Sequence, residues 1–187
     1  MTITDTPIAG LKVIEPRVFG DDRGYFYESY NANTFRDAGI ENVFVQDNQS
    51  ASVKGVFRGM HYQRPPYAQA KLVRVLEGEV LDVAVDIREG SPTYGQWHSI
   101  RLSGENKKQF FIPQGFAHGF LTLSDRAIFA YKCDNFYNKE SEGGLRFDDP
   151  AIGIDWEVDI KDVLLSDKDK VLPALGAHLK FIEAITK

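Results

Sequence analysis

The stretch EGEVLDVAVDIREGSPTYG, residues 77–95, decides the fold class of this chain. Apolar residues occupy every second position on one face, and a mixed set fills the positions between them: Leu81, Val83, Val85 and Ile87, and Val80, Asp82, Ala84 and Asp86. A period of two is typical of a β-strand, and the Gly, Ser and Pro that follow are turn residues. The stretch therefore predicts a strand over 79–87 that ends in a turn.

Short segments of similar composition recur on both sides of this stretch, separated by Gly, Pro, Asp and Asn. The further expected strands are 11–14, 24–30, 44–52, 56–62, 70–76, 95–102, 109–112, 118–123 and 127–133. Many short strands with frequent turns indicate a sandwich or barrel, most simply an antiparallel jelly roll. No repeat or linker divides the chain, so we expect one all-β domain over residues 1–187.

Helical patterns are few. A short helix is expected near 32–38, and a second from about Pro173, because proline suits the first turn of a helix. In this C-terminal segment Leu175, Leu179, Ile182 and Ala184 would form one apolar stripe.

Composition limits the partners, the location and the cysteine chemistry that we expect for this chain. The chain has 187 residues, a net charge of -5 and a pI of about 5.4, so we expect no nucleic-acid partner and no membrane surface. Without a signal-like N-terminus or a long apolar run, a cytoplasmic location is the expectation. The single cysteine, Cys133, excludes an intrachain disulfide and a multi-cysteine zinc site, and is expected to be a small half-buried hydrophobe.

The richest stretch for chemistry is GVFRGMHYQRPPYAQAKLVRVLEGEV, residues 55–80. Arg58 and His61 are three residues apart and would face opposite sides of a regular strand. A bulge at Gly59 would bring both side chains to one cavity. Lys71 shares a strand face with valines, so it lies either at an edge with its amine in water or in a functional pocket.

Two segments resemble parts of the cupin superfamily motifs: EGEV (77–80) resembles the end of the first motif, and IPQGFAHGF (112–120) resembles the second. Metal-binding cupins supply a His-x-His pair and a carboxylate from the first motif and a histidine from the second. Here Gly59 and Gln63 stand two residues before and after His61, so a site would have His61 and His118 as its only imidazoles and would lack the usual ligand count. The other two histidines, His98 and His178, are expected to be exposed or structural. We expect no metal and no cofactor, and a cavity of His, Lys, Arg and Tyr then indicates acid–base chemistry.

Longer motifs resemble the dTDP-4-dehydrorhamnose 3,5-epimerase family, in order and over most of the chain. They are DDRGYFYESY (21–30), FVQDNQS (44–50), FRGMHYQ (57–63), PPYAQAKLV (65–73), DVAVDIR (82–88), GSPTYGQW (90–97), IPQGFAHGF (112–120), YKCDNFYNKESEGGLRFDDP (131–150) and LLSDKD (164–169). The resemblance implies an enzyme that inverts C3 and C5 of a nucleoside-diphospho-4-keto-6-deoxyhexose through an enolate.

The resemblance also implies the roles of four residues. His61 would be the base, and Asp169 would fix its tautomer and stabilise the imidazolium. Tyr131 would be the acid on the other face of the sugar, and Lys71 would stabilise the enolate oxygen. His118 would help at the same oxygen, and we add Asp82 as its expected orienting partner.

Other matching positions are implied to hold the rest of the nucleotide-sugar substrate: Arg23, Glu28, Gln46, Asp47, Asn48, Arg58 and Glu142. Guanidinium groups such as those of Arg23 and Arg58 suit phosphate oxygens. The family forms homodimers in which each subunit completes the other's site. We therefore expect a dimer, with the N-terminal strands crossing to the neighbour.

Three positions depart from the family pattern: Phe136, Phe147 and Glu157 stand where Tyr, Trp and Pro are usual. None is a proposed catalytic group, so these departures bear on the identity of the substrate more than on the type of reaction. An epimerase of C3 alone, a metal-dependent cupin enzyme that uses His61, His118, Glu77 or Glu79, and a non-catalytic sugar-nucleotide-binding module are the alternatives.

Overall fold

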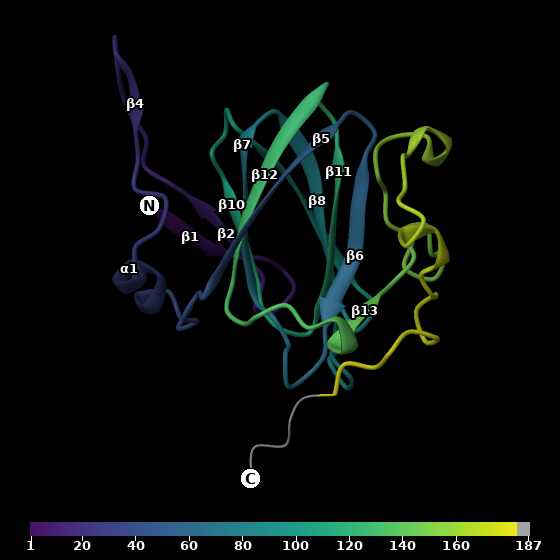
Figure 1. Cartoon of the computed structure of the whole chain (residues 1–187). Coiled ribbons are helices and arrows are strands. Elements are labelled where there is room, and N and C mark those ends of the chain that lie inside the picture. Colours follow the sequence, from purple (N-terminus) through teal and green to yellow (C-terminus); the bar gives the residue numbers. More distant parts are fainter. Residues whose placement is uncertain (183–187) are drawn as a thin grey trace.

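A computed structural model of the chain describes residues 1–182, which form two packed antiparallel sheets (Figure 1). The six-stranded sheet has the order β1 (Thr2–Asp5), β2 (Lys12–Glu15), β10 (Gln109–Ile112), β7 (Lys71–Glu77), β12 (Arg126–Cys133) and β5 (Gln46–Val53). The five-stranded sheet has the order β13 (Glu142–Gly144), β6 (Phe57–Gln63), β11 (Phe116–Thr122), β8 (Glu79–Asp86) and β9 (Trp97–Ser103). The expected jelly roll is confirmed.

Every expected strand overlaps an observed one, but strands β1, β3 (Phe19–Asp21) and β13 had no counterpart in the expectations. The expected strand over 24–30 is shorter, since β4 covers only Gly24–Phe26. Strands β3 and β4 form a separate two-stranded arm that extends away from the barrel (Figure 1). All residues of both strands are exposed, so the rest of the described chain leaves this arm largely uncovered, although the amine of Lys107 lies 4.0 Å from the centre of the Tyr25 ring.

The strand that decided the fold class, β8, is buried on both faces. Val80 and Ala84 belong to the apolar cluster between the two sheets, together with Phe120 and Phe129. The other face, which carries Leu81, Val83 and Val85, packs instead under the C-terminal part of the chain. Figure 1 shows that part as a yellow-green layer beside β6. The double burial explains why apolar residues occupy both faces of this strand.

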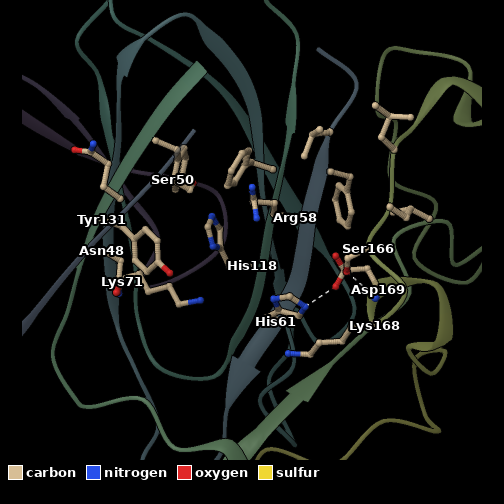
Figure 2. A pocket seen from close by; sticks show the side chains of 17 residues that line it. Asn48, Ser50, Arg58, His61, Lys71, His118, Tyr131, Ser166, Lys168 and Asp169 are labelled. Carbon is tan, nitrogen blue, oxygen red and sulfur yellow. Dashed lines mark hydrogen bonds and ion pairs between the residues drawn. The ribbon is translucent and has the colours of Figure 1, made fainter. Parts of the chain in front are cut away.

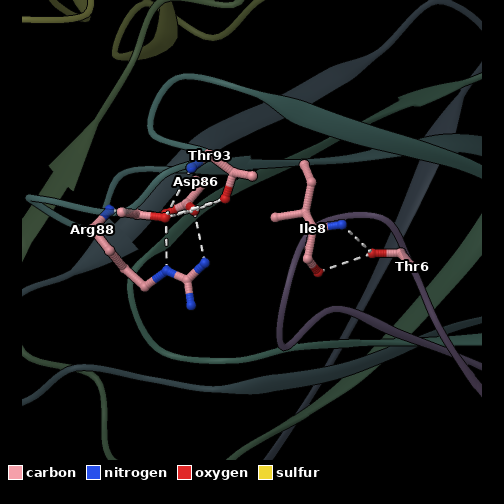
Figure 3. A network of polar contacts seen from close by, with 6 residues as sticks. Thr6, Ile8, Asp86, Arg88 and Thr93 are labelled. Carbon is pink, nitrogen blue, oxygen red and sulfur yellow. Dashed lines mark hydrogen bonds and ion pairs between the residues drawn. The ribbon is translucent and has the colours of Figure 1, made fainter.

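A buried aspartate organises the end of β8 (Figure 3). Asp86 is fully buried and accepts hydrogen bonds from Arg88 Nη2 at 2.7 Å and from the hydroxyls of Ser91 and Thr93 at 2.6 Å. Burial opposes ionisation of this carboxyl, but these donors together hold the pKa of Asp86 below its ordinary value. The network fixes the turn 86–95 that the sequence predicted after the strand.

Helices are short, as expected. α1 covers Ala32–Asp37 and is capped by Asn31, and single 3-10 turns occur at η1 (Lys139–Ser141), η2 (Ile160–Asp162) and η3 (Asp169–Val171). No helix in residues 1–182 has the length and hydropathy that a membrane span requires.

The expected helix from about Pro173 is wrong for the residues that the structure describes. Residues 173–182 contain a turn around Gly176, whose φ of 89° is left-handed, and an isolated bridge at Phe181. Leu175 donates its N–H to Asp149 and not to a helical carbonyl, so the backbone finds tertiary partners in place of helical ones. Ala184, the last residue of the expected stripe, lies outside the described residues.

Candidate active site

A cavity of about 590 Å³ opens between the sheets and is closed on one side by the loop 164–169 (Figure 2). Its lining comes from β5, β6, β7, β11 and β12 together with that loop. The polar side chains that line it include Asn48, Ser50, Arg58, His61, Lys71, His118, Tyr131, Ser166, Lys168 and Asp169. Strands and one loop far apart in sequence thus build a single polar site.

The expected bulge at Gly59 is present. On β6, Arg58 and His61 are three residues apart, but they pair with positions only two apart on β11. Gly59 has a φ of 139°, and a Cβ there would lie 2.4 Å from Cα of Gly119. Only glycine permits this close approach of two strands. The bulge turns both Arg58 and His61 toward the cavity.

His61 and Asp169 form a close pair at the cavity wall. Nε2 of His61 lies 2.7 Å from Oδ1 of Asp169, a carboxylate only 5% exposed. Burial opposes ionisation of Asp169, but His61, Ser166 and Lys168 outweigh it and hold the pKa of Asp169 below its ordinary value. An ionised Asp169 can only accept a hydrogen bond, so the neutral imidazole of His61 must carry its proton on Nε2. The other ring nitrogen then has a free lone pair and faces the cavity (Figure 2).

A second histidine–aspartate pair lies deeper. Nε2 of His118 is 2.9 and 3.0 Å from the two carboxylate oxygens of Asp82, which is fully buried on β8. Burial lowers the pKa of His118 more than Asp82 raises it. Burial thus favours the neutral form of His118, and the expected pairing with Asp82 is present.

Lys71 and Tyr131 lie on neighbouring strands of the six-stranded sheet, opposite His61. The amine of Lys71 is 5.9 Å from the centre of the Tyr131 ring. Burial lowers the pKa of Lys71 and raises the pKa of Tyr131, so the cavity disfavours charge on both. Cys133, next along β12, is fully buried, and desolvation raises the pKa of its thiol to about 11.

A smaller cavity of about 320 Å³ continues the first and shares Asn48, His61, Lys71 and Tyr131 with it. Its additional lining residues include Gln46, Tyr137 and Glu142. Expected site residues therefore line one continuous cleft.

The cleft also contains residues that the sequence did not predict. Lys168 lines the cavity but was not an expected site residue, although it lies in the quoted motif LLSDKD. Its amine is 2.5 Å from Oε1 of Glu142, across the mouth of the cleft. Ser50 and Ser166 were also missed, since isolated serines have no distinguishing pattern.

Three expected residues lie outside this cleft. Arg23 is on the exposed arm, where it binds Asp21, and the carboxylate of Glu28 accepts a hydrogen bond from Asn31. Asp47 points to the outer face of its sheet and pairs with Lys132 at 3.0 Å. Side chains alternate along β5, so Asp47 faces away where Gln46 and Asn48 face the cleft.

Within residues 1–182 no three His, Cys, Asp or Glu side chains are grouped so as to hold a metal ion. The expected absence of metal and cofactor stays a prediction.

The fold and the cleft together define a class: a cupin-like jelly-roll enzyme with titratable side chains on both walls of its barrel. The family model described as dTDP-4-dehydrorhamnose 3,5-epimerase matches residues 5–177. The chain belongs to the dTDP-4-dehydrorhamnose 3,5-epimerase family. The expected family is confirmed, and with it the expected type of enzyme, an isomerase that epimerises a sugar nucleotide.

Individual relatives support the same family assignment. The dTDP-4-dehydrorhamnose 3,5-epimerase of Shigella flexneri is 55% identical over 170 residues, which is 90% of this chain and 93% of that protein. The crystal structure of the enzyme of that name from Elizabethkingia anophelis has a TM-score of 0.91 at 54% identity and covers 94% of this chain and 97% of its own. The dTDP-6-deoxy-D-glucose-3,5-epimerase of Legionella pneumophila, in complex with dTDP-4-keto-L-rhamnose, has a TM-score of 0.90 at 54% identity and covers 94% and 93%.

Proposed function

We propose that the chain converts dTDP-4-dehydro-6-deoxy-D-glucose to dTDP-4-dehydro-L-rhamnose, with His61 as the base that removes the protons at C3 and C5. The observation that carries this proposal is the 2.7 Å pair of His61 and Asp169 inside the cleft that also contains Lys71 and Tyr131. The proposed product is the compound bound in the Legionella structure, where it is called dTDP-4-keto-L-rhamnose.

The 4-keto group acidifies the hydrogens on the adjacent carbons, so one base within reach of the ring can form an enolate. The free nitrogen of His61 faces the cavity because Asp169 holds the other nitrogen. An imidazole has a basicity near working pH, and the carboxylate stabilises the imidazolium that forms.

Inversion needs a proton donor on the opposite face of the ring. Tyr131 projects from the six-stranded sheet and His61 from the five-stranded sheet, so the two groups approach a bound sugar from opposite walls. Burial raises the pKa of Tyr131, which keeps its proton available at neutral pH. Reprotonation by Tyr131 after removal by His61 inverts the carbon.

The negative charge on the enolate oxygen needs a nearby positive charge or a hydrogen-bond donor. In our proposal Lys71 provides it, because its amine lies in the same cavity, on the same wall as Tyr131. Burial disfavours the ammonium form of Lys71, and the negative charge that develops on the enolate oxygen stabilises it during the reaction. His118, oriented by Asp82, lines the same cavity.

Arg58 is proposed to bind the diphosphate. Its Nε donates to Ser52 Oγ at 3.0 Å and its Nη2 to the carbonyl of Ala51 at 3.4 Å, which fixes the guanidinium beside the cavity. Gln46, Asn48 and Glu142 line the continuation of the cleft, where the nucleoside would extend. Asp47 is left out because its carboxylate lies on the other face of the sheet.

Arg23 and Glu28 enter the proposal through a homodimer. The arm that carries Arg23 exposes large apolar side chains, including Phe19 (52%) and Phe26 (70%). Apolar groups of this size are normally covered by a partner. We propose that the arm crosses to a second copy, where Arg23 and Glu28 complete the neighbouring site.

The test is incubation with dTDP-4-dehydro-6-deoxy-D-glucose in heavy water, read by NMR of the sugar. The proposal predicts deuterium at C3 and C5 and none for the His61→Ala variant. Deuterium at C3 alone would make the enzyme a 3-epimerase, and absence of exchange in the wild type would end the proposal. Dialysis against EDTA is expected to leave the exchange rate unchanged, whereas a metal-dependent cupin enzyme would lose it.

A further inference from the structure

Asp169 reaches His61 on a segment that belongs to no sheet. We call residues 164–175 the strap. At its beginning, Leu164 pairs with the edge of β6: its N–H donates to the carbonyl of Gly55 at 2.8 Å, and its carbonyl accepts from Phe57 at 3.0 Å. This anchor holds only one end of the strap, so the position of Asp169 depends on a second anchor beyond η3.

The second anchor lies at residues 173–175. The carbonyl of Pro173 accepts the N–H of Arg146 at 2.9 Å, and the N–H of Leu175 donates to Oδ2 of Asp149 at 2.6 Å. Between Asp169 and this anchor the strap presses on β13. A Cβ on Gly144 would lie 2.7 Å from the side chain of Leu172, and Gly144 is the register partner of His61. The strap and His61 are therefore close-packed neighbours.

Asp149 is built to hold this anchor. It is 3% exposed, and its other carboxylate oxygen accepts the N–H of Ala151 at 2.9 Å. Both hydrogen bonds come from backbone N–H groups, one in its own turn and one in the strap. Hydrogen bonds to a buried carboxylate are stronger than those between neutral groups. The carboxylate of Asp149 thus links its own turn to the strap, the segment that carries Asp169.

We infer that Asp149 is a positioning residue for the His61–Asp169 pair, acting through the strap. This inference rests on the proposed function of that pair, and it adds a residue outside the cleft. Asp149 does not line the cavity, so it touches no reacting atom. Loss of its hydrogen bond to Leu175 should let Asp169 move away from His61 while the substrate-binding residues keep their places.

The first test compares Asp149→Asn with Asp148→Asn. Leu175 and Ala151 donate to different carboxylate oxygens, and Asn replaces one of these oxygens with an NH2 group, so one of the two N–H groups loses its acceptor in this geometry. Asp148 is the neighbouring residue and pairs with the exposed Arg146 at 2.8 Å, which makes it a matched control. For Asp149→Asn we expect kcat to fall about 10- to 100-fold with KM within about twofold, because a small misplacement of a catalytic group costs this much. Asp148→Asn should resemble the wild type.

A second readout needs no substrate. A histidine hydrogen-bonded to a carboxylate gives a far-downfield imidazole N–H proton resonance, which is assigned here by its loss in His61→Ala and in Asp169→Asn. Asp149→Asn should weaken or remove this resonance in the dimeric, folded protein. If Asp149→Asn only lowers Tm and keeps the resonance and kcat, Asp149 is merely structural and the inference is wrong.

A second pair of variants tests the same hydrogen bond from the side of Leu175, and it replaces the first test if Asp149→Asn does not fold. Leu175 and Gly176 are the central residues of a turn closed by the N–H of Ala177 on the carbonyl of Ala174 at 3.0 Å, and Gly176 has a φ of 89°. Proline suits the first central position of such a type II turn and removes the N–H that Asp149 accepts. Leu175→Pro should therefore reproduce Asp149→Asn, whereas Leu175→Ala, which keeps the N–H, should not. Equal effects of the two would overturn the inference.

The two proposals fail separately. If His61→Ala keeps its epimerase activity, the proposed function is wrong, and the resonance still decides whether Asp149 positions Asp169. If His61→Ala is inactive but Asp149→Asn keeps both the resonance and kcat, only the inference about Asp149 fails.

Discussion

Nε2 of His61 lies 2.7 Å from Oδ1 of Asp169, although 108 positions separate the two residues in the sequence. The strand β6 presents the imidazole from the barrel, and the strap brings the carboxylate from outside it. The contact is a tertiary one, and it leaves one imidazole nitrogen free toward the cavity.

Asp169→Asn is expected to lower kcat by about 10²- to 10⁴-fold, because an amide neither fixes the tautomer of His61 nor stabilises the imidazolium. Asp167→Asn is the control, since Asp167 lies in the same loop, is fully exposed and pairs only with Lys170. Steady-state kinetics of both variants decide. Similar kcat values for Asp169→Asn and the wild type would contradict the role of this pair.

Tyr131→Phe should separate proton removal from inversion. His61 remains able to form the enolate and to return a proton to the same face, so solvent deuterium should still enter the substrate. Inversion should fall by at least about 10²-fold, because the donor on the opposite wall is missing. NMR measures both processes in one sample. Tyr94→Phe, remote from the cleft, is the control, and equal loss of exchange and inversion would contradict Tyr131 as the acid.

Lys71→Met is expected to slow catalysis by about 10²- to 10³-fold and to raise the stability of the fold. Burial lowers the pKa of Lys71 in the folded state, so its charged form costs stability at neutral pH. This cost is full below the folded-state pKa and disappears above about pH 10.4, where the unfolded lysine is also neutral.

The measurement is Tm at pH 7 and near pH 10.5: the gain over the wild type should be largest at pH 7. Lys108→Met removes an exposed amine paired with Glu15 and should change neither rate nor Tm appreciably. A lower Tm for Lys71→Met at pH 7 would contradict the destabilising effect of the buried amine.

Asp86→Asn should destabilise the fold by about 3 kcal/mol at pH 7, because it removes one partner from a buried, hydrogen-bonded ion pair with Arg88. The pKa of Asp86 is lowered in the folded state, so its contribution is present above the unfolded pKa of about 3.9 and is lost as pH falls through the folded value. Urea unfolding at pH 7 and at pH 3 gives the comparison. A difference that grows on acidification would contradict this sign.

Mixing two inactive variants tests the crossed arm. If Arg23 serves the site of the neighbouring subunit, a dimer of one Arg23→Ala and one His61→Ala subunit contains one complete site. Refolding the two variants together should then restore activity, up to about a quarter of the wild type for random pairing at equal amounts. No restoration, or a monomer by light scattering, would contradict the proposed exchange. The His61→Ala variant mixed with itself is the control.

Much of this molecule could be predicted from sequence. The period of two along β8 and its neighbours indicated the jelly roll, because alternation of side chains along a strand is a local property. The bulge at Gly59 was also predictable, since glycine is the residue that permits such an approach of two strands. The helix expected from Pro173 failed because Asp149 takes the N–H of Leu175, and no local pattern predicts that partner.

The functional residues divide in the same way. Motif resemblance identified His61, Lys71 and Tyr131, and the cleft does contain them. It also named Asp47, which the alternation of β5 turns to the outer face, and it gave no prominence to Lys168 beside Asp169. Side-chain direction and loop contacts depend on the packed structure, so a match of residue types to a family motif does not determine them.

Residue patterns and motifs were enough to predict the fold class, the family and the presence of an imidazole, an amine and a phenol on strands of the domain. The tertiary structure brings together the pairs that were expected, Asp169 with His61 and Asp82 with His118. It alone shows the contact of Asp149 with the strap and the pairing of Lys168 with Glu142. The physical reason is that strand periodicity is set by neighbours in the chain, whereas a buried carboxylate takes whichever donor the packing of distant segments brings to it.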